Sequence, residues 1–420
     1  MNDVEHDYRR DDGCARSLRV GLVDEMWAAG ALSDSRWRAI FEEIPRHTFV
    51  PCVFVPTDAS GSFRPLDGRV PANRYEWLRL VYSDDIAITQ LDGDDEAWRI
   101  ATRNGTVRAV TMTCTSSQPR LMARMLSELD VDDTSRVLEI GTGTGYNAAL
   151  LSARLGSDQV STIDVDPVLV SRAGERLRGL GLSPHIAIGD GAKGIPERAM
   201  FDRIVTTAAF PRIPPAWIHQ SVEAGVILAN HARLLGGVAA LVRLVVRGNI
   251  AEGRFRTLSA GFMPTRTDDS ASALKLFRAL TDSEVLAART EQRSPTIYQA
   301  VKDEGFRFFL GLRSNILDIG LSYPDGEPDE QWLLTPDGGW AYITPAGQAR
   351  QSPHSVLDTV QTLWNEWQGL GAPHRDDFGL TVATDGHHRV WLGNPDSNDS
   401  WDLPLPHQAL GHPPTAPKWP

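Results

Sequence analysis

Three glycines at alternate positions, Gly141, Gly143 and Gly145, follow a short apolar run at Val137–Ile140. Glycine lets the backbone turn sharply and approach a ligand closely, and a helix that begins after such a turn presents free N–H groups. The stretch Val137–Leu151 therefore predicts a strand, a ligand-binding turn and a helix, as in open α/β sheets that bind nucleotide-sized ligands. The spacing differs from the G-x-G-x-x-G pattern of dinucleotide sites, which disfavours a nicotinamide cofactor.

Two acidic residues further along have the type and position of ligand-binding carboxylates. Asp164 ends the next apolar run, VSTID, and an acid about 20 residues after a glycine turn usually accepts hydrogen bonds from ribose hydroxyls. Asp166 follows closely and is the alternative. Asp190 stands between Gly189 and Gly191 after the third apolar run. It either accepts from an adenine amino group or forms an ordinary Asp-Gly turn.

Strand-like and helix-like patterns alternate from residue 136 to about residue 246, which predicts a doubly wound, mostly parallel sheet. A hairpin pattern, Val238–Val246 followed by Phe255–Phe262, closes this region. The expected strands are Arg136–Ile140, Gln159–Ile163, Pro184–Ile188, Arg203–Thr206 and Val226–Ala229, and the expected helices are Tyr146–Leu155, Pro167–Leu180 and Pro215–Val222.

The length of 420 residues predicts two or three domains. Short apolar runs at Leu78–Tyr82, Trp98–Ala101 and Phe306–Leu312 look strand-like, and Thr265–Ser272 is a candidate linker. The expected parts are a disordered N-terminus (1–16), a catalytic domain (17–264) with its core at 115–264 and an expanded substrate region at 52–114, an α+β accessory domain (273–403) and a proline-rich tail (404–420).

Composition excludes several classes of function. The formal net charge of -12 and the pI of about 5.4 leave no basic face for a nucleic acid. Cys14, Cys52 and Cys114 are too widely spaced for a disulfide framework or a zinc site, and we expect no metal. No run approaches the ~18 apolar residues of a membrane helix, and the N-terminus has no apolar secretion signal. We therefore expect a cytoplasmic protein that does not bind a membrane.

The order of the motifs along the chain resembles the protein-L-isoaspartate O-methyltransferase family. The resemblance covers about 17–264 and implies a class I methyltransferase fold, which is Rossmann-like and carries a C-terminal antiparallel hairpin on its sheet. It also implies S-adenosyl-L-methionine as cofactor and S-adenosyl-L-homocysteine as product. The matching pieces are IPRHTFVP at 44–51, TSSQPRLMARM at 115–125, VLEIGTGTGYNAALL at 137–151, TIDVD at 162–166, GDG at 189–191 and TTAAFPRIP at 206–214.

The resemblance also suggests a role for individual residues. Ser117 falls at the active-site serine of the family, with Thr115 and Ser116 beside it. Gln118 and His231 are candidate substrate contacts, although a loop histidine is more often structural. Arg120 and Arg46 could attract an anionic substrate, although surface arginines are the default. The candidate cofactor-binding residues are Glu139, Gly141, Thr142, Gly143, Gly145, Tyr146, Asp164, Val165, Asp190, Gly191 and Thr207.

A peptide carboxylate is the substrate that the resemblance implies. A carboxylate with a pKa near ~4 is already ionised at pH 7, so the reaction needs no general base. The site has to hold one oxygen in line with the methyl–sulfur bond. Ser117, through its hydroxyl or its backbone N–H, can hydrogen-bond the substrate carboxyl. No Ser-His-Asp pattern supports a covalent nucleophile.

The chain also departs from the family. The D-x-P-L-P-I-G segment before the serine is missing, the acidic region 82–111 replaces it, and residues 265–420 follow the hairpin. Similarly enlarged relatives occur beside genes for ribosomally made, modified peptides. Our first hypothesis is therefore methylation of an L-aspartyl side chain in a precursor peptide, after which the ester cyclises to aspartimide.

Two other functions remain open. One is repair of isoaspartyl residues in damaged proteins, for which the same catalytic core would serve. The other is a non-catalytic peptide-binding protein that retains a methyltransferase shell. The intact glycine turn, Asp164 and Ser117 argue against a non-catalytic protein.

Overall fold

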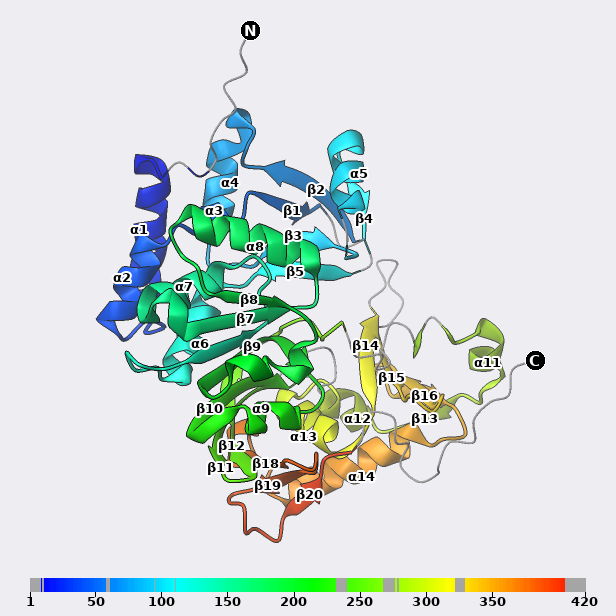
Figure 1. Ribbon diagram of the computed structural model, residues 1–420. Coiled ribbons are helices and arrows are strands. Elements are labelled where there is room, and N and C mark those ends of the chain that lie inside the picture. Colours follow the sequence, from blue (N-terminus) through cyan, green and yellow to red (C-terminus); the bar gives the residue numbers. More distant parts are fainter. Residues whose placement is uncertain are drawn as a thin grey trace, which may run out of the picture. The chain divides into compact units, whose positions relative to one another are not determined.

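The computed structural model describes residues 9, 11–57, 61–93, 95–109, 111–231, 240–266, 276–277, 279–321 and 329–404 (Figure 1). The contacts divide the chain into two compact units. The first comprises Met1–Ala208 and His219–Leu228, and the second comprises Ala209–Ile218 and Ala229–Pro420. Strands β9 (Phe201–Phe210) and β10 (Ser221–His231) each cross the division along the chain.

A mostly parallel sheet is the centre of the first unit, with the strand order β10-β9-β6-β7-β8. Strands β6 (Val137–Ile140), β7 (Val160–Asp164) and β8 (His185–Ile188) run parallel to their neighbours, and β9 runs parallel to β6. All four residues of β6 are buried, as expected for a central strand covered on both faces. The predicted class I methyltransferase-like sheet is therefore confirmed.

The helices that flank this sheet begin where local sequence favours it. Helix α7 (Tyr146–Leu155) starts directly after Gly145. Helix α8 (Pro167–Gly179) has proline at its first position, and the Asp166 side chain accepts from two backbone N–H groups of its first turn. Both helices match the predicted spans closely, because strong start signals coincide with a helical apolar pattern.

A second, antiparallel sheet in the first unit is built from the expanded region, in the order β4-β2-β1-β3-β5. The strand-like interpretation of Leu78–Tyr82 and Trp98–Ala101 was wrong, since these runs belong mainly to helices. A short apolar run does not by itself distinguish a strand from a buried helix turn. The elements are β1 (Cys52–Pro56), β2 (Ser62–Asp67), β3 (Ala87–Leu91), β4 (Val107–Arg108), β5 (Met112–Ser116), α4 (Arg74–Val81) and α5 (Glu96–Asn104).

Helix α1 (Gly13–Ala28) begins inside the segment 1–16 that was expected to be disordered. Asp12 caps it by accepting from the backbone N–H of Ala15 at 3.0 Å, and Ala15 itself is buried. The expectation was therefore wrong for residues 13–16, whereas 1–8 and 10 lie outside the described residues. The following helices of this unit are α2 (Ser35–Glu43), α3 (Arg46–Phe49) and α6 (Pro119–Leu129).

In the second unit, β11 (Ala240–Arg247) and β12 (Ile250–Ser259) form the predicted antiparallel hairpin. Strand β18 (Phe378–Ala383) then pairs with β12, and β19 (His388–Leu392) and β20 (Ser400–Asp402) extend the sheet. The hairpin and the expected accessory domain 273–403 thus share one sheet instead of forming separate domains. An unpaired β12 would leave a row of open backbone groups, which β18 satisfies.

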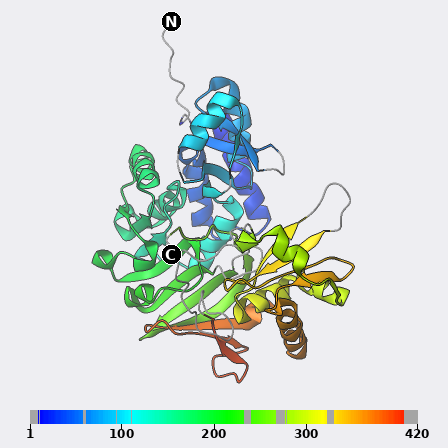
Figure 2. The same cartoon turned by 90° about the vertical axis from the view of Figure 1, so that its right-hand side faces the viewer.

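The remaining strands of the second unit form another antiparallel sheet, ordered β13-β17-β16-β15-β14. Helix α14 contacts β16, and Figure 1 and Figure 2 show it beside this sheet. The expected strand at Phe306–Leu312 is instead helix α13, which Asp303 caps. The elements are β13 (Glu291–Gln292), β14 (Leu317–Leu321), β15 (Glu330–Leu334), β16 (Trp340–Ile343), β17 (Gln348–Gln351), α9 (Pro215–His219), α11 (Asp282–Ala287), α12 (Pro295–Ala300), α13 (Glu304–Arg313) and α14 (Val356–Gly369).

Most tryptophans of the second unit serve its core. Trp332 and Trp340 pack together with Tyr342, and Trp367 packs against Phe306. The expected linker over 267–272 and the tail over 405–420 lie outside the described residues. Within the described part of the chain, no helix is both long and apolar enough to cross a membrane.

Candidate functional site

The ends of three parallel strands bring the glycine turn and the acidic residues to one edge of the sheet. The N–H of Gly141 donates to the carbonyl of Ile163 at 2.8 Å, and the N–H of Gly189 donates to the carbonyl of Asp164 at 2.9 Å. The turn after β6, the end of β7 and the segment after β8 are therefore adjacent (Figure 1). The carboxyl edge of such a sheet is where open α/β folds bind their ligands.

The glycine turn depends on backbone conformations that only glycine adopts easily. Gly141, Gly143 and Gly145 all have positive φ, at 103°, 50° and 89°. A Cβ on Gly141 would lie 2.5 Å from the hydroxyl oxygen of Thr207, and that hydroxyl donates to the Gly141 carbonyl at 2.6 Å. A Cβ on Gly145 would lie 3.0 Å from Cβ of Ala173. The turn is therefore held tightly between β9 and α8.

Asp164 is half-buried and is bound to this turn. Its Oδ2 accepts from the N–H of Gly143 at 2.8 Å, and its Oδ1 accepts from the N–H of Asp166 at 3.1 Å. A carboxylate has about four acceptor positions, so two remain for a ligand. The alternative residue, Asp166, is buried, caps α8 and accepts from Gln90 at 3.0 Å. The geometry thus favours Asp164 over Asp166 as the ligand-binding acid.

The serine segment, which we define as residues 115–118, lies where β5 ends and α6 begins, and Arg46 holds it in place. The Arg46 guanidinium donates to the Ser116 hydroxyl at 3.2 Å and to the carbonyls of Ser116 and Ser117 at 3.0 Å each. It also donates to the carbonyls of Val81 and Asp85, at 2.6 and 3.1 Å. Burial lowers the pKa of Arg46 to about 10. The sequence left two roles open for Arg46, attraction of an anionic substrate and an ordinary surface position. Instead, Arg46 is 1% exposed and joins three chain segments.

The Ser117 side chain differs from its neighbours. Ser116 is buried and is bound to Arg46, whereas Ser117 and Thr115 are half-buried. Among the described residues, no hydrogen bond engages the Ser117 hydroxyl, so it is available to a ligand. The resemblance places Ser117 at the active-site serine of the family, and the half-buried Ser117 remains a candidate contact for the substrate carboxyl.

Asp84 fixes the far side of the serine segment and was not identified from the sequence. It accepts from the N–H of Arg120 at 2.9 Å and from the Gln118 side chain at 3.2 Å. The Arg120 guanidinium pairs with it at 3.1 Å, between Nε and Oδ2. Gln118 and Arg120, the candidate substrate contacts, thus have their side chains directed to Asp84. Asp84 is one of several acids in the region 82–111, and nothing in its sequence context indicated that it would accept from the first turn of α6.

Comparison with known proteins assigns the family. Residues 95–232 match the family described as Protein-L-isoaspartate(D-aspartate) O-methyltransferase. The Protein-L-isoaspartate O-methyltransferase of Methanoculleus marisnigri is 40% identical over 256 residues, which cover 60% of this chain and 90% of that protein. The chain belongs to the protein-L-isoaspartate O-methyltransferase family. Members of this family are S-adenosylmethionine-dependent enzymes that methylate protein carboxyl groups.

Other similarities are narrower or confirm only the fold. The enzyme of the same name from Anaeromyxobacter dehalogenans is 48% identical over 103 residues. The match covers 48% of that enzyme and 24% of the present chain. A solved structure described as a protein-L-isoaspartate O-methyltransferase aligns over 90% of this chain and all of that one, with a TM-score of 0.51 and 20% identity. At that identity, the alignment supports the fold alone.

Several residues fit the cofactor of this methyltransferase family. Two apolar side chains are exposed at adjacent strand ends, Val165 at 39% and Ile188 at 61%, where a flat ring would cover them. Asp190 accepts from the N–H of Ala192 at 2.9 Å and caps the short turn that begins at Gly191. Ile188 was not identified from the sequence, although an isoleucine directly before the GDG segment is a usable signal.

Glu139 supports the turn from within the core. Its carboxyl group accepts from the Asn147 amide at 2.7 Å and from the Thr162 hydroxyl at 2.8 Å. The Thr162 hydroxyl is also 2.7 Å from that of Thr142. Burial raises the pKa of Glu139 to about 7, and the nearby Asp164 contributes to the shift. Three of the candidate cofactor-binding residues are therefore buried and support the glycine turn from the protein core: Glu139, Thr142 and Tyr146.

His231, the remaining candidate, belongs to the second unit. Its ring is 1% exposed and lies edge-on to Phe255, with ring centroids 5.9 Å apart. This burial corresponds to the structural role that is common for histidine. Within the described residues, no group of three histidine, cysteine or acidic side chains is arranged to hold a metal ion.

Proposed function

We propose that this protein transfers a methyl group from S-adenosyl-L-methionine to an aspartyl-type side-chain carboxylate of a peptide. The observation that carries the proposal is that one unit contains both halves of the required site. The glycine turn with Asp164 provides the cofactor half, and the Ser117 segment held by Arg46 provides the acceptor half. Membership of a family of carboxyl methyltransferases supports this assignment.

The chemistry needs few protein groups. When bound, S-adenosyl-L-methionine supplies an electrophilic methyl group, whose bond to sulfur breaks as its bond to the carboxylate oxygen forms. Asp164 would bind ribose hydroxyls with its two remaining acceptor positions. Ser117 would donate to the second oxygen of the substrate carboxylate and so orient the first. Arg46 keeps Ser117 in position without touching the substrate, because all of its contacts are within the protein.

The first candidate target is an L-aspartyl residue of a ribosomally made precursor peptide. In the methyl ester, the backbone nitrogen of the next residue attacks the ester carbonyl, loses its proton and expels methanol, which gives an aspartimide. The acidic region 82–111, which stands in place of the family's D-x-P-L-P-I-G segment, supports this target. A precursor-specific enzyme has use for such a replacement directly before the serine segment.

The second candidate target is an L-isoaspartyl residue in a damaged protein. The names of the relatives from Methanoculleus marisnigri and Anaeromyxobacter dehalogenans support it, since both are protein-L-isoaspartate O-methyltransferases. The two targets differ by the position of one carboxylate along the peptide, so the same Ser117 segment could serve either.

One experiment tests both candidates. The purified protein is incubated with S-adenosyl-L-methionine and, separately, an isoaspartyl peptide, the same peptide with L-aspartate, and the peptides encoded beside its gene. Mass spectrometry then follows the gain of a methyl group and the later loss of methanol. Methylation of the isoaspartyl peptide alone would support repair, and methylation followed by methanol loss in a neighbouring precursor would support aspartimide formation.

A variant pair shows whether the site described above is responsible. We expect Asp164→Asn to abolish most of the methylation, whereas Asp158→Asn should keep it. Asp158 is an exposed acid just before β7, at the opposite end of that strand, so it controls for the loss of one negative charge. If no peptide is methylated and S-adenosyl-L-homocysteine does not bind, the proposal fails and a non-catalytic peptide-binding role is favoured.

A further inference from the structure

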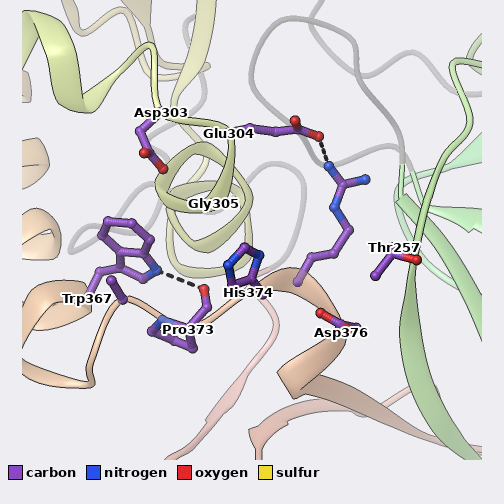
Figure 3. Close-up of a pocket in the computed structure, with 10 residues that line it drawn as sticks. Thr257, Asp303, Glu304, Gly305, Trp367, Pro373, His374 and Asp376 are labelled. Carbon is purple, nitrogen blue, oxygen red and sulfur yellow. Dashed lines mark hydrogen bonds and ion pairs between the residues drawn. The ribbon is translucent and has the colours of Figure 1, made fainter.

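The second unit contains a pocket of about 510 Å³ that the proposed reaction does not use. It lies where the N-terminus of α13, the turn after α14 and the strand β12 come together (Figure 3). Glu304 belongs to α13, Trp367 to α14 and Thr257 to β12. All residues that line it belong to the second unit, whereas the glycine turn and the serine segment belong to the first.

Arg375 gives this pocket a hydrogen-bond donor without a partner. Its side chain is only 10% exposed, and its Nη2 pairs with Glu304, an interaction drawn as a dashed line in Figure 3. Its Nη1 is buried and has no hydrogen-bond partner. A buried, unsatisfied donor is unfavourable, and it is rare in folded proteins. The pocket therefore fits a ligand that carries an acceptor such as a carbonyl oxygen.

The rim of the pocket is acidic. Asp303, Glu304 and Asp376 are exposed, and Figure 3 shows Asp303 and Asp376 on different sides of the opening. Glu304 balances the charge of Arg375. Asp303 accepts from the N–H of Phe306 at 2.9 Å, and no ion pair or hydrogen bond of the described residues engages the Asp376 carboxylate. The lining therefore carries three carboxylates against one arginine, Arg375, whose charge interacts with Asp376 as well as with Glu304.

A metal ion does not explain these acids, because among the described residues no group of three is arranged to hold one. An organic cation explains them better. A free amine or guanidine would satisfy the rim but would leave the Arg375 donor unpaired. A peptide satisfies both, because a basic residue carries a cationic side chain and a backbone carbonyl oxygen. The methylenes of a long basic side chain would also cover the apolar wall formed by Trp367 and Pro373.

We propose that this pocket binds a basic segment of the peptide substrate, away from the residue that is methylated. The backbone carbonyl of a lysine or arginine accepts from Nη1 of Arg375, and its side chain extends between Asp303 and Asp376. This inference rests on the proposed function, since it names a second contact for the same substrate. It implies that a basic residue outside the target aspartate contributes to affinity.

Binding to the full-length protein tests the inference without any methyl transfer. The probe is a fluorescent peptide with two lysines between glycine and serine residues, and its match carries glutamine in place of lysine. Fluorescence anisotropy measures both, with free lysine and a diamine as competitors. We expect the lysine peptide to bind more tightly than the glutamine peptide, with the difference shrinking as salt is raised, because the rim charges are exposed.

The variants Asp376→Asn and Asp303→Asn should each weaken binding of the lysine peptide by about threefold to fivefold, the range for a partly exposed charge pair. Asparagine at position 303 can still accept from the N–H of Phe306. Asp396→Asn is the matched control, since Asp396 is an exposed acid of the same unit outside the pocket, in the turn between β19 and β20. Arg375→Met removes the unpaired donor and should weaken both peptides. If Arg375→Met does not fold, the two acidic variants decide.

Three results would overturn the inference. Equal binding of the lysine and glutamine peptides would show that the pocket makes no contact with a cationic side chain. Equal affinities of Asp376→Asn, Asp303→Asn and Asp396→Asn would place the site elsewhere. Displacement of the peptide by free lysine or the diamine at similar concentrations would show a small-cation site. Because no methyl transfer is measured, a wild type that binds the lysine peptide as expected but methylates nothing would refute the proposed function and leave this inference standing.

Discussion

The guanidinium of Arg46 binds both the hydroxyl and the carbonyl of Ser116, at 3.2 and 3.0 Å, across 70 positions of the chain. Arg46 has no carboxylate partner among its hydrogen bonds, because its other acceptors are backbone carbonyls. A buried cation thus connects α3, the segment after α4 and the serine segment. The position of the serine segment therefore depends on a residue far from it in sequence.

Replacing Arg46 should damage both stability and activity. Arg46→Met leaves the buried carbonyls of Val81 and Ser116, and the half-buried carbonyl of Ser117, without this donor. Each unsatisfied buried carbonyl costs roughly 1–3 kcal/mol, so we expect the free energy of unfolding to fall by at least about 2 kcal/mol. Arg46→Lys keeps the charge but cannot bridge three segments, and it should lower kcat more than it raises KM. Urea unfolding and peptide methylation measure these effects.

The control for Arg46 is Arg36→Lys, a change at an exposed arginine that pairs with Asp133 at 2.7 Å. A surface ion pair contributes about 0–1 kcal/mol, so this variant should be close to wild type in both assays. If Arg46→Lys behaves like Arg36→Lys, the serine segment does not need Arg46 to hold it.

Ser117→Ala tests whether the accessible hydroxyl binds the substrate carboxylate. A hydrogen bond to a charged group contributes about 1.5–3 kcal/mol, so kcat/KM should fall roughly 10- to 150-fold while stability stays unchanged. Ser116→Ala instead removes a buried partner of Arg46, and it should lower stability at least as much as activity. A decrease below about twofold for Ser117→Ala would assign the contact to its backbone N–H.

Asp164→Asn should weaken cofactor binding more than it weakens the fold. The carboxylate accepts from the N–H groups of Gly143 and Asp166, and an amide nitrogen would face one of these donors. We expect about a 100-fold loss of affinity for S-adenosyl-L-homocysteine, equivalent to about 2.7 kcal/mol. Isothermal titration calorimetry measures it, with Asp158→Asn as the charge-matched control. Equal affinities for the two variants would exclude Asp164 as a ligand.

Glu139 should make stability depend on pH. Burial raises its pKa from an ordinary value of 4.5 to about 7, so the folded state holds its proton more tightly than the unfolded state. Its stabilising contribution is therefore fully present below pH 4.5 and is lost as the pH rises through about 7. The full loss is of the order of 3 kcal/mol, since one pKa unit corresponds to about 1.4 kcal/mol.

Glu139→Gln removes this dependence, because glutamine is neutral at every pH and can still accept from Asn147. The difference in unfolding free energy between the variant and the wild type should shift in favour of the variant as the pH rises from 5 to 8. Urea unfolding at several pH values measures it. Parallel pH profiles for the two proteins would show that Glu139 does not titrate in this range.

Local sequence patterns were enough to predict the parallel strands, the glycine turn and the position of Asp164. These features are local: apolar periodicity selects strands and helices, glycine permits the positive φ of Gly141, and the end of a parallel strand places an acid at the ligand edge. The same local patterns led to a wrong prediction of strands where the structure has helices α4, α5 and α13, because a short apolar run is compatible with a strand or a helix.

Contacts between residues that are distant in the sequence could not be predicted in this way. Arg46 reaches Ser116, Asp84 caps α6, β18 closes the open edge of β12, and Arg375 pairs with Glu304. Each of these contacts satisfies a buried charge, a helix end or a strand edge. A charged residue, a helix end or a strand edge can be located in the sequence. The residue that pairs with it cannot, because the packing of the chain selects that residue and the spacing along the chain does not.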